Sequence, residues 1–136
     1  MDNLTPDQRR KNMQNIHSKW TKSELLVATE LKKHKIYFAA HVKNIIGNPD
    51  FVFRRKKVVV FIDSDFWHGH PERFIMPKSN LEYWAKKIEH NRKRDQEVTM
   101  QLEKAGWKVI RIWEKDLKQN FLTCFNQILK ALNVLS

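Results

Sequence analysis

The sequence predicts an α/β fold, a three-layer sandwich with a central mixed β-sheet, and two kinds of pattern support this. Short β-branched and aromatic runs indicate strands at 51–53, 58–62 and 107–113, with another expected within 36–42. Apolar residues at three- and four-residue spacing indicate helices that begin near Thr21, Asn80 and Asn120, the second of them ending at Ala105-Gly106. A chain of 136 residues has room for one hydrophobic core.

The N-terminal segment predicts two helices of different character. Thr5-Pro6-Asp7-Gln8 has the pattern of a capping box with proline at the first helical position, and the helix that follows is basic and poor in apolar residues. Two interpretations remain open, namely an arm over 1–20 that orders against a partner and a loosely packed helix. Thr21 and Glu24 form a second capping box at the start of a single domain over 21–136. Glu24 is thus accounted for by helix capping alone.

Charge and cysteine content narrow the class of protein. Lys and Arg number 26 against 15 acidic residues, a net charge of +11, which indicates a polyanionic partner: nucleic acid first, an anionic membrane surface second. A basic protein without such a partner is the alternative. No apolar run approaches the roughly 20 residues of a membrane span. Cys124, the single cysteine, excludes an internal disulfide and a multi-cysteine zinc site, and it is expected to be buried. We expect a cytoplasmic protein.

The stretch from Asp50 to Asp63 predicts a β-hairpin. Its two apolar runs flank Arg54-Arg55-Lys56-Lys57, and a four-residue loop over 54–57 is expected because Lys-Lys does not favour a two-residue turn. The expected register pairs Phe53 with Val60 and Phe51 with Ile62, which sets Asp50 directly opposite Asp63. Two carboxylates that close repel each other unless a proton or cation lies between them, so this register predicts a divalent metal site.

Further ionisable groups follow the second strand of this hairpin. His68 and His70 come just after Asp63 and Asp65, where loops at strand ends commonly carry catalytic groups. A histidine beside a metal-bound water is a natural general base at neutral pH. Asp95 lies on the apolar stripe of the long helix, where it needs either a basic partner or a place in the active site.

Aromatic residues lie in the same region. Phe66 and Trp67 follow Asp65, and Trp84 lies one turn into the next helix. They are either core residues or, interleaved with basic side chains, residues that stack on or wedge between bases; the basic side chains are Arg73, Lys78, Lys86 and Lys87. Together with the charge and the carboxylates, the residues match metal-assisted phosphodiester hydrolysis best.

Several motifs resemble those of very-short-patch mismatch-repair endonucleases, the Vsr-type branch of the PD-(D/E)xK nuclease superfamily. The matching segments cover roughly residues 9 to 117: RRKNMQNIHSKWTKSE, GNPDFVF, VVVFIDSDFWHGH, NLEYWAKKIEHNRKRD and GWKVIRIWE. The resemblance implies a restriction-endonuclease-like fold and a monomeric enzyme that nicks double-stranded DNA 5′ of the thymine in a T·G mismatch, with Mg²⁺ as cofactor.

The resemblance also implies roles for individual residues. Asp50 and the backbone carbonyl of Ile62 would bind the metal, His68 would be the general base, and Asp95 would orient it, with Asp63 and Glu24 beside the site. The aromatic wedge in the duplex would be Phe66, Trp67 and Trp84. The N-terminal arm would contact DNA through Arg9, Arg10, Lys11, Met13 and Lys19.

The chain departs from the family pattern at one place. Where family members commonly hold a structural zinc with cysteines and a histidine, this chain has Asp65, Glu72 and Lys115 in the cysteine positions, and His70 remains. A lysine in place of a thiolate argues against zinc, so we expect Asp65 or Glu72 to pair with Lys115 instead. The resemblance implies that this loop helps to shape mismatch recognition, so two alternatives stay open: a Vsr-like restriction endonuclease that cuts unmodified duplex, and a non-catalytic DNA-binding module.

Overall fold

The computed structural model describes residues 20–133, which fall into two compact units, one ending at Ile36 and one beginning at Tyr37. The predicted N-terminal arm lies outside the described residues apart from Trp20, and so do all five of its predicted DNA contacts, including Met13 and Lys19. The domain bounds 1–20 and 21–136 stay a prediction.

The first unit contains helix α2, Lys22–Lys33, which begins where the capping pattern predicted. The Thr21 hydroxyl accepts a hydrogen bond from the Glu24 N–H at 3.2 Å. The same hydroxyl lies 3.2 Å from a carboxylate oxygen of Glu24, to which it donates. Thr21 therefore caps the helix as the sequence predicted, and the Glu24 carboxylate lies in the first turn, where the helix dipole favours a negative charge.

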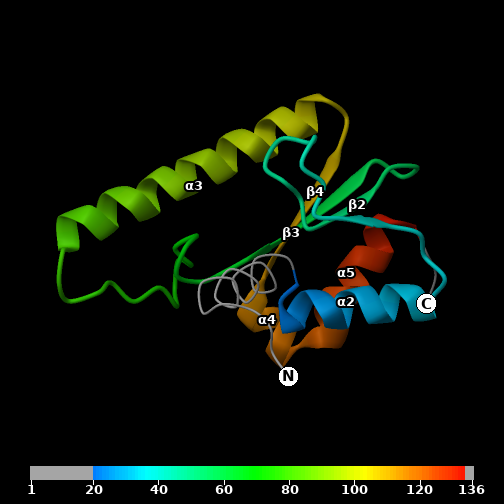
Figure 1. The fold of residues 1–136 in the computed structure, drawn as a ribbon, viewed down its shortest axis with the longest axis horizontal. Coiled ribbons are helices and arrows are strands. Elements are labelled where there is room, and N and C mark those ends of the chain that lie inside the picture. The colour runs from blue at the N-terminus through cyan, green and yellow to red at the C-terminus, as the bar shows by residue number, and fades with distance from the viewer. Residues whose placement is uncertain (1–19, 134–136) are drawn as a thin grey trace, which may run out of the picture. The chain divides into compact units, whose positions relative to one another are not determined.

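The second unit is built on a four-stranded mixed sheet with the order β1-β2-β3-β4 (Figure 1). The strands are β1 (Ala39–Ala40), β2 (Phe51–Phe53), β3 (Val58–Asp63) and β4 (Lys108–Trp113). The first three pair antiparallel, whereas β3 and β4 run parallel. A parallel pair requires a long crossover connection, which helix α3, Leu81–Lys104, supplies. The predicted α/β fold with a mixed sheet is confirmed.

The predicted register of the hairpin is wrong by two residues. The loop does span 54–57 as expected, with Lys57 at a φ of 54°, but Phe53 pairs with Val58 and Phe51 with Val60. One more step in the same register brings Asp50 level with Phe61 rather than with Asp63. Phe53 and Val58 are the last pair before the four-residue loop, and no further pair forms within the loop.

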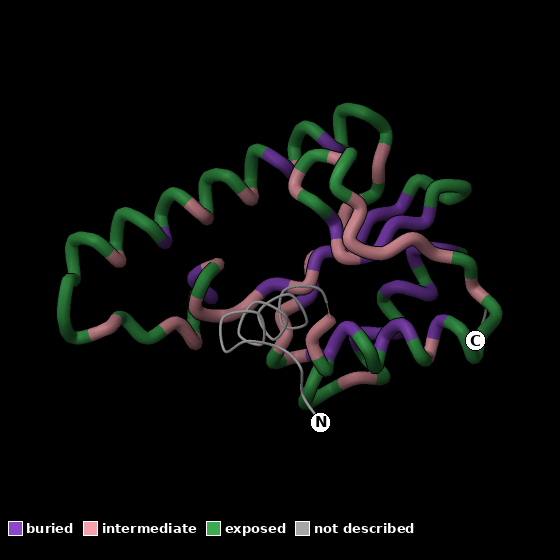
Figure 2. Tube along the Cα trace, viewed as in Figure 1, coloured by how far each residue is buried: buried purple, intermediate pink, exposed green. Residues whose placement is uncertain are grey.

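Helices cover both faces of the sheet. On one face, α3 packs Val98 and Leu102 against Val52, Val59 and Phe61. The alternate residues of β2 and β3 point to the other face, on the side of helices α4 (Glu114–Gln119) and α5 (Phe121–Ala131), both of which contact β4. In Figure 2, the hairpin strands are buried along nearly their whole length, as the unbroken apolar run of β3 predicted.

Three element predictions need correction. The strand expected within 36–42 is reduced to Ala39–Ala40, because Tyr37 is 96% exposed and His41 takes a φ of 51° that ends it. Helix α4 was not predicted, whereas α5 begins after Asn120 as expected and buries Cys124. Leu81, expected on the apolar stripe of α3, is exposed. The predicted end of α3 is confirmed at Ala105, followed by Gly106 with a φ of 92°.

Within residues 20–133, no helix is both long enough and apolar enough to cross a membrane.

Candidate active site

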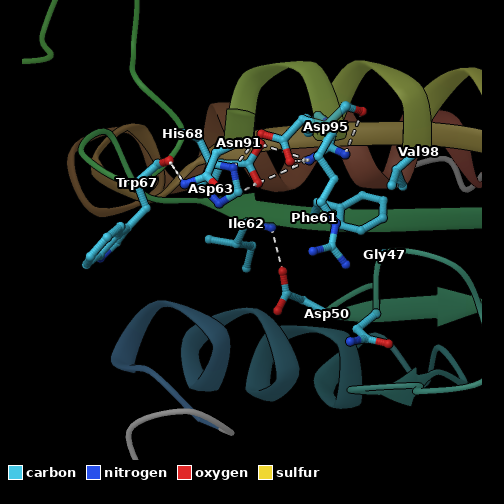
Figure 3. A pocket seen from close by; sticks show the side chains of 13 residues that line it. Gly47, Asp50, Phe61, Ile62, Asp63, Trp67, His68, Asn91, Asp95 and Val98 are labelled. Carbon is cyan, nitrogen blue, oxygen red and sulfur yellow. Dashed lines mark hydrogen bonds and ion pairs between the residues drawn. The ribbon is translucent and has the colours of Figure 1, made fainter. Parts of the chain in front are cut away.

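A cleft of about 440 Å³ lies between the end of β3, the start of the loop after it, and α3 (Figure 3). All its lining residues belong to the second unit. Four of the predicted catalytic or metal-binding carboxylate and imidazole groups line it, namely those of Asp50, Asp63, His68 and Asp95. Ile62 and Trp67 line it as well. The topology explains this gathering, because β3 ends between β2 and β4 while α3 crosses above it.

Asp50 is held at the end of β3 by a backbone hydrogen bond. The N–H of Ile62 donates to Oδ2 of Asp50 at 2.7 Å, and the N–H of Asp50 donates to the carbonyl of Val60 at 3.0 Å. In a β-strand the N–H and C=O of one residue face the same neighbouring strand. The Ile62 carbonyl therefore faces the side on which Asp50 lies. A carboxylate and a carbonyl on one side of a strand end are hard oxygen ligands suited to Mg²⁺.

His68 and Asp95 form a short pair beneath α3. Nδ1 of His68 lies 2.5 Å from Oδ2 of Asp95. Because a carboxylate only accepts hydrogen bonds, Nδ1 carries the proton and Nε2 is the basic nitrogen of the neutral ring. Nε2 in turn lies 3.8 Å from Oδ1 of Asp63. The expectation that Asp95 contacts the active-site histidine agrees with this geometry.

Asp63 pairs with a cation from the neighbouring strand instead of facing Asp50. Nη1 of Arg111 lies 3.2 Å from each oxygen of the Asp63 carboxylate. Asp63 is only 5% exposed, and this burial raises the pKa of its carboxyl, whereas His68 and Arg111 act in the opposite direction. In Figure 3, Asp63, His68 and Asp95 gather on the α3 side of β3, while Asp50 approaches Ile62 from the other side.

Arg111 is a site residue that the sequence reasoning missed. Its guanidinium also donates to the backbone carbonyl of Asp95 at 3.2 Å and to the Thr99 hydroxyl at 2.9 Å, and it lies 4.2 Å from the centre of the Phe61 ring. Arg111 thereby links β4, β3 and α3. A lone arginine inside the apolar strand sequence KVIRIW was the signal, because a charge there needs an acidic partner on the same face.

Two other residues near these side chains were not singled out. Arg94 lines it from α3 and is exposed, with no partner among the described residues. His41, which had no feature in the sequence that distinguished it from a structural histidine, has a ring nitrogen within 4.8 Å of an Asp50 carboxylate oxygen.

The loop after β3 is tied to α3 through its backbone. Arg92 donates to the Gly69 carbonyl from Nε at 3.1 Å and from Nη2 at 2.7 Å, and Asn91 donates to the carbonyl of Trp67 at 2.8 Å. These bonds hold the residues on both sides of His68, so the imidazole is positioned by its backbone as well as by Asp95.

The three predicted wedge residues form one cluster. The ring centres of Phe66 and Trp67 are 5.0 Å apart, those of Phe66 and Trp84 are 5.2 Å apart, and those of Trp67 and Trp84 are 5.8 Å apart. Trp67 is 46% exposed. Lys87 lies over the rings of Trp67 and Tyr83, at 5.9 Å and 5.8 Å from their centres. A partly exposed aromatic cluster beside a cation is a surface that can stack on bases.

The expected pairing of Asp65 or Glu72 with Lys115 is wrong: among the described residues neither carboxylate forms an ion pair with Lys115, and Asp65 has another partner. Arg73 donates to both oxygens of Asp65, from Nε at 2.8 Å and from Nη2 at 3.1 Å, and to Asp116 from Nη1 at 2.7 Å. Arg73 was expected among the basic side chains interleaved with the wedge, but its guanidinium is engaged by these two carboxylates.

Glu24 belongs to the first unit, whereas the cleft is lined by the second, so its part in the site stays a prediction.

Comparison with known proteins identifies the family to which the chain belongs. Residues 1–73 match the family model described as DNA mismatch endonuclease Vsr. The chain is 42% identical to the type II nicking enzyme V.NmeDIP of Neisseria meningitidis serogroup C over 97% of this chain and 90% of that protein. It is 42% identical to the type II nicking enzyme V.HpaIIP of Haemophilus parainfluenzae, over 88% and 87%.

A third relative is the DNA mismatch endonuclease Vsr of Escherichia coli strain K12, 33% identical over 81% of this chain and 71% of that protein. The family match covers more than half of the chain, and these relatives match over most of its length. The chain therefore belongs to the Vsr family of DNA-nicking endonucleases, whose fold is restriction-endonuclease-like.

Proposed function

We propose that this protein is a Mg²⁺-dependent endonuclease that nicks duplex DNA 5′ of the thymine in a T·G mismatch, the reaction that starts very-short-patch repair of deaminated 5-methylcytosine. The observation that carries the proposal is the cleft in which Asp50, the Ile62 backbone and the His68–Asp95 pair lie together. The names of its relatives, nicking enzymes and a mismatch endonuclease, support it.

The metal ligands in this proposal are the Asp50 carboxylate and the Ile62 carbonyl. The hydrogen bond from the Ile62 N–H fixes the orientation of the carboxylate, and the carbonyl of Ile62 faces the same side of β3. A bound divalent ion supplies charge neutralisation for the scissile phosphate and makes a water more acidic. Asp63 is not a direct ligand in this arrangement, because Arg111 engages both of its oxygens.

His68 acts as the general base. With Nδ1–H donated to Asp95, Nε2 accepts a proton from the attacking water. The imidazolium that results is stabilised by two carboxylates, that of Asp95 at Nδ1 and that of Asp63 near Nε2. Asp95 therefore acts twice, by selecting the tautomer and by stabilising the charge.

DNA binding in this proposal combines charge and stacking. Phe66, Trp67 and Trp84 wedge into the duplex at the mismatch, where a mispaired base costs less to unstack. Arg94 is positioned to contact a backbone phosphate at the cleft. The predicted N-terminal arm adds contacts through its basic residues, and the protein nicks as a monomer.

The substrate is tested with a panel of three duplexes that differ at one base pair: T·G, T·A and C·G, each with Mg²⁺, Mn²⁺ or EDTA. Nicking of the T·G duplex alone, and only with a metal, is the expected result. Cleavage of matched duplex would indicate a Vsr-like restriction endonuclease, and binding without cleavage under every condition would indicate a DNA-binding module.

The site is tested by replacing Asp50. Asp50→Asn and Asp50→Ala should lower the nicking rate by about 1000-fold or more, since a metal centre contributes several kcal/mol to the transition state. The dissociation constant for the T·G duplex, measured by fluorescence anisotropy, should change little. Glu103→Gln, an exposed acidic residue near the far end of α3, is the control and should nick normally. A fully active Asp50→Ala would refute the metal site.

A further inference from the structure

One arginine joins the two ends of the His68 loop, residues 64–74, to each other and to α4. Asp65 lies at the start of this loop and Arg73 at its end, and Asp116 comes from α4, 43 residues further along the chain. Arg73 forms a bidentate contact with Asp65 through Nε and Nη2, and it donates to Asp116 from Nη1. The hydrogen bonds of bidentate arginine–carboxylate pairs are short, directional and stronger than neutral hydrogen bonds.

The same loop has a second internal tie at His70. Nδ1 of His70 accepts hydrogen bonds from the N–H groups of Glu72 and Arg73, each at 3.0 Å. The His70 ring lies against Trp113, with 4.6 Å between the ring centres. His70 thus braces the turn that presents Arg73 to its two carboxylates, and it links the loop to the end of β4.

The four residues at the positions of the family's zinc ligands do not fit a zinc ion. Asp65 is engaged by Arg73, and the Nδ1 lone pair of His70 is used by two backbone N–H groups. Lys115 has an ammonium group, which cannot be a ligand at neutral pH, and Glu72 is exposed. Binding of zinc would also require Asp65 to give up its two hydrogen bonds with the Arg73 guanidinium.

We propose that the Arg73 guanidinium fastens the His68 loop to α4 in place of a structural zinc, and that Arg73 is thereby a positioning residue for His68 and the aromatic wedge. Phe66, Trp67 and His68 all lie between Asp65 and Arg73, and the ring of Phe66 lies 5.7 Å from that of Phe74 beside Arg73. Asn91 and Arg92 hold the loop to α3. The loop is therefore held between two helices, by backbone bonds on one side and by a charge pair on the other.

The proposal separates positioning from metal binding. Asp50, just before β2, and Ile62, in β3, lie outside the loop that Arg73 holds, whereas His68 lies within it. Loss of Arg73 should therefore reduce catalysis through misplacement of the base, for which an error of about 1 Å can cost 100-fold. The concentration of Mg²⁺ that gives half-maximal activity should stay the same.

The charge pair also predicts a dependence on acid. Arg73 holds the pKa of the Asp65 carboxyl below its usual range, with smaller effects of the same sign from His70 and Lys115. A carboxyl whose pKa is lowered on folding stabilises the fold above its unfolded pKa, and that stabilisation is lost as the pH falls through its folded pKa. The difference in stability between the wild-type protein and Arg73→Gln should therefore shrink as the pH falls below about 4.

The experiment compares Arg73→Gln, Arg73→Lys and the control Lys118→Gln, which removes a charge from an exposed pair on α4. On the T·G duplex, which assumes the proposed function, Arg73→Gln should lower the single-turnover nicking rate by about 100-fold with little change in DNA affinity. Arg73→Lys should recover only part of the lost nicking rate, because lysine cannot form a bidentate contact with a carboxylate. Lys118→Gln should match the wild type.

Two readouts do not need activity. Trypsin should cleave after Lys78, an exposed residue that follows this loop, faster in Arg73→Gln than in Lys118→Gln. Elemental analysis of the purified wild-type protein should give less than one zinc per chain, and EDTA should leave its melting temperature unchanged. One tightly bound zinc per chain, or Arg73→Gln with normal nicking and normal trypsin resistance, would overturn the proposal. If the wild type cuts no duplex, the proposed function fails, while trypsin and zinc analysis still decide the role of Arg73.

Discussion

At the scale of single residues, Asp50 and Asp63, which were predicted to face each other, have different partners in the structure. A register error of two residues keeps every side chain on its predicted face, because side chains alternate with a period of two. This is why the burial of Phe51, Phe53 and Val60 follows the prediction while the pairing of Asp50 with Asp63 does not. Asp50 bonds to the Ile62 backbone, and Asp63 pairs with Arg111.

The pairing of Asp63 with Arg111 predicts a non-additive loss of stability. Arg111→Met leaves a carboxylate that is 5% exposed without its cation, which should cost about 2 to 4 kcal/mol in the free energy of unfolding. Asp63→Asn combined with Arg111→Met should cost less than the sum of the single changes, as measured by urea denaturation. Arg94→Met, an exposed arginine, is the control, expected within about 0.5 kcal/mol of the wild type. Additive losses would mean that the two residues do not stabilise each other.

At the scale of elements, local sequence patterns predicted where most helices and strands lie. They failed where the structure depends on a residue distant in sequence or on an unusual backbone φ. Capping by Thr21 and the end of α3 at Ala105-Gly106 depend on neighbours in sequence, and both were predictable. Asp116, one of the two partners of Arg73, lies 43 residues away, and no local pattern marks it. His68 and Asp95 were identified as neighbours through the family resemblance, whereas Arg111 needed the parallel pairing of β3 and β4 to be known.

The surroundings of Gly69 show that the His68 loop packs closely on α3. A Cβ at this position would lie 2.5 Å from Nε of Arg92 and 2.6 Å from Cγ2 of Ile88, at a φ of 60°. Gly69→Ala should therefore displace Arg92 from the Gly69 carbonyl, lower stability by about 1 to 3 kcal/mol, and slow nicking through His68.

The matched control for this change is Gly106→Ala. Gly106 also has a positive φ, 92°, but the nearest atom to its added Cβ is the flexible Lys57 Nζ at 3.6 Å. Backbone strain alone should cost about 1 kcal/mol there, with normal nicking of the refolded protein. Equal losses of stability and activity in the two variants, compared by urea denaturation and single-turnover nicking, would show that the contact with Arg92 is unimportant.

At the scale of the whole molecule, the overall charge is positive although carboxylates line the candidate active site. The net charge is +11, while the cleft itself holds three carboxylates whose fields are offset by Arg111, by the proposed metal and by the neighbouring basic side chains. Composition alone indicated a polyanionic partner, but it did not indicate which surface meets it. The structure adds that Lys86 and Lys87 are exposed on α3 near its N-terminal end, where Trp84 joins the aromatic cluster.

This arrangement predicts a local effect of charge on the salt dependence of DNA binding. Each phosphate neutralised contributes about 0.9 to the slope of log affinity against log salt, so Lys86→Gln with Lys87→Gln should reduce the slope by about 2. Lys118→Gln with Lys130→Gln removes the same charge from α4 and α5, and should leave the slope nearly unchanged. Both are measured by anisotropy on the T·G duplex in the Asp50→Asn background, so that no substrate is consumed. An equal fall in slope for the two pairs would mean that net charge, and not the α3 surface, determines binding.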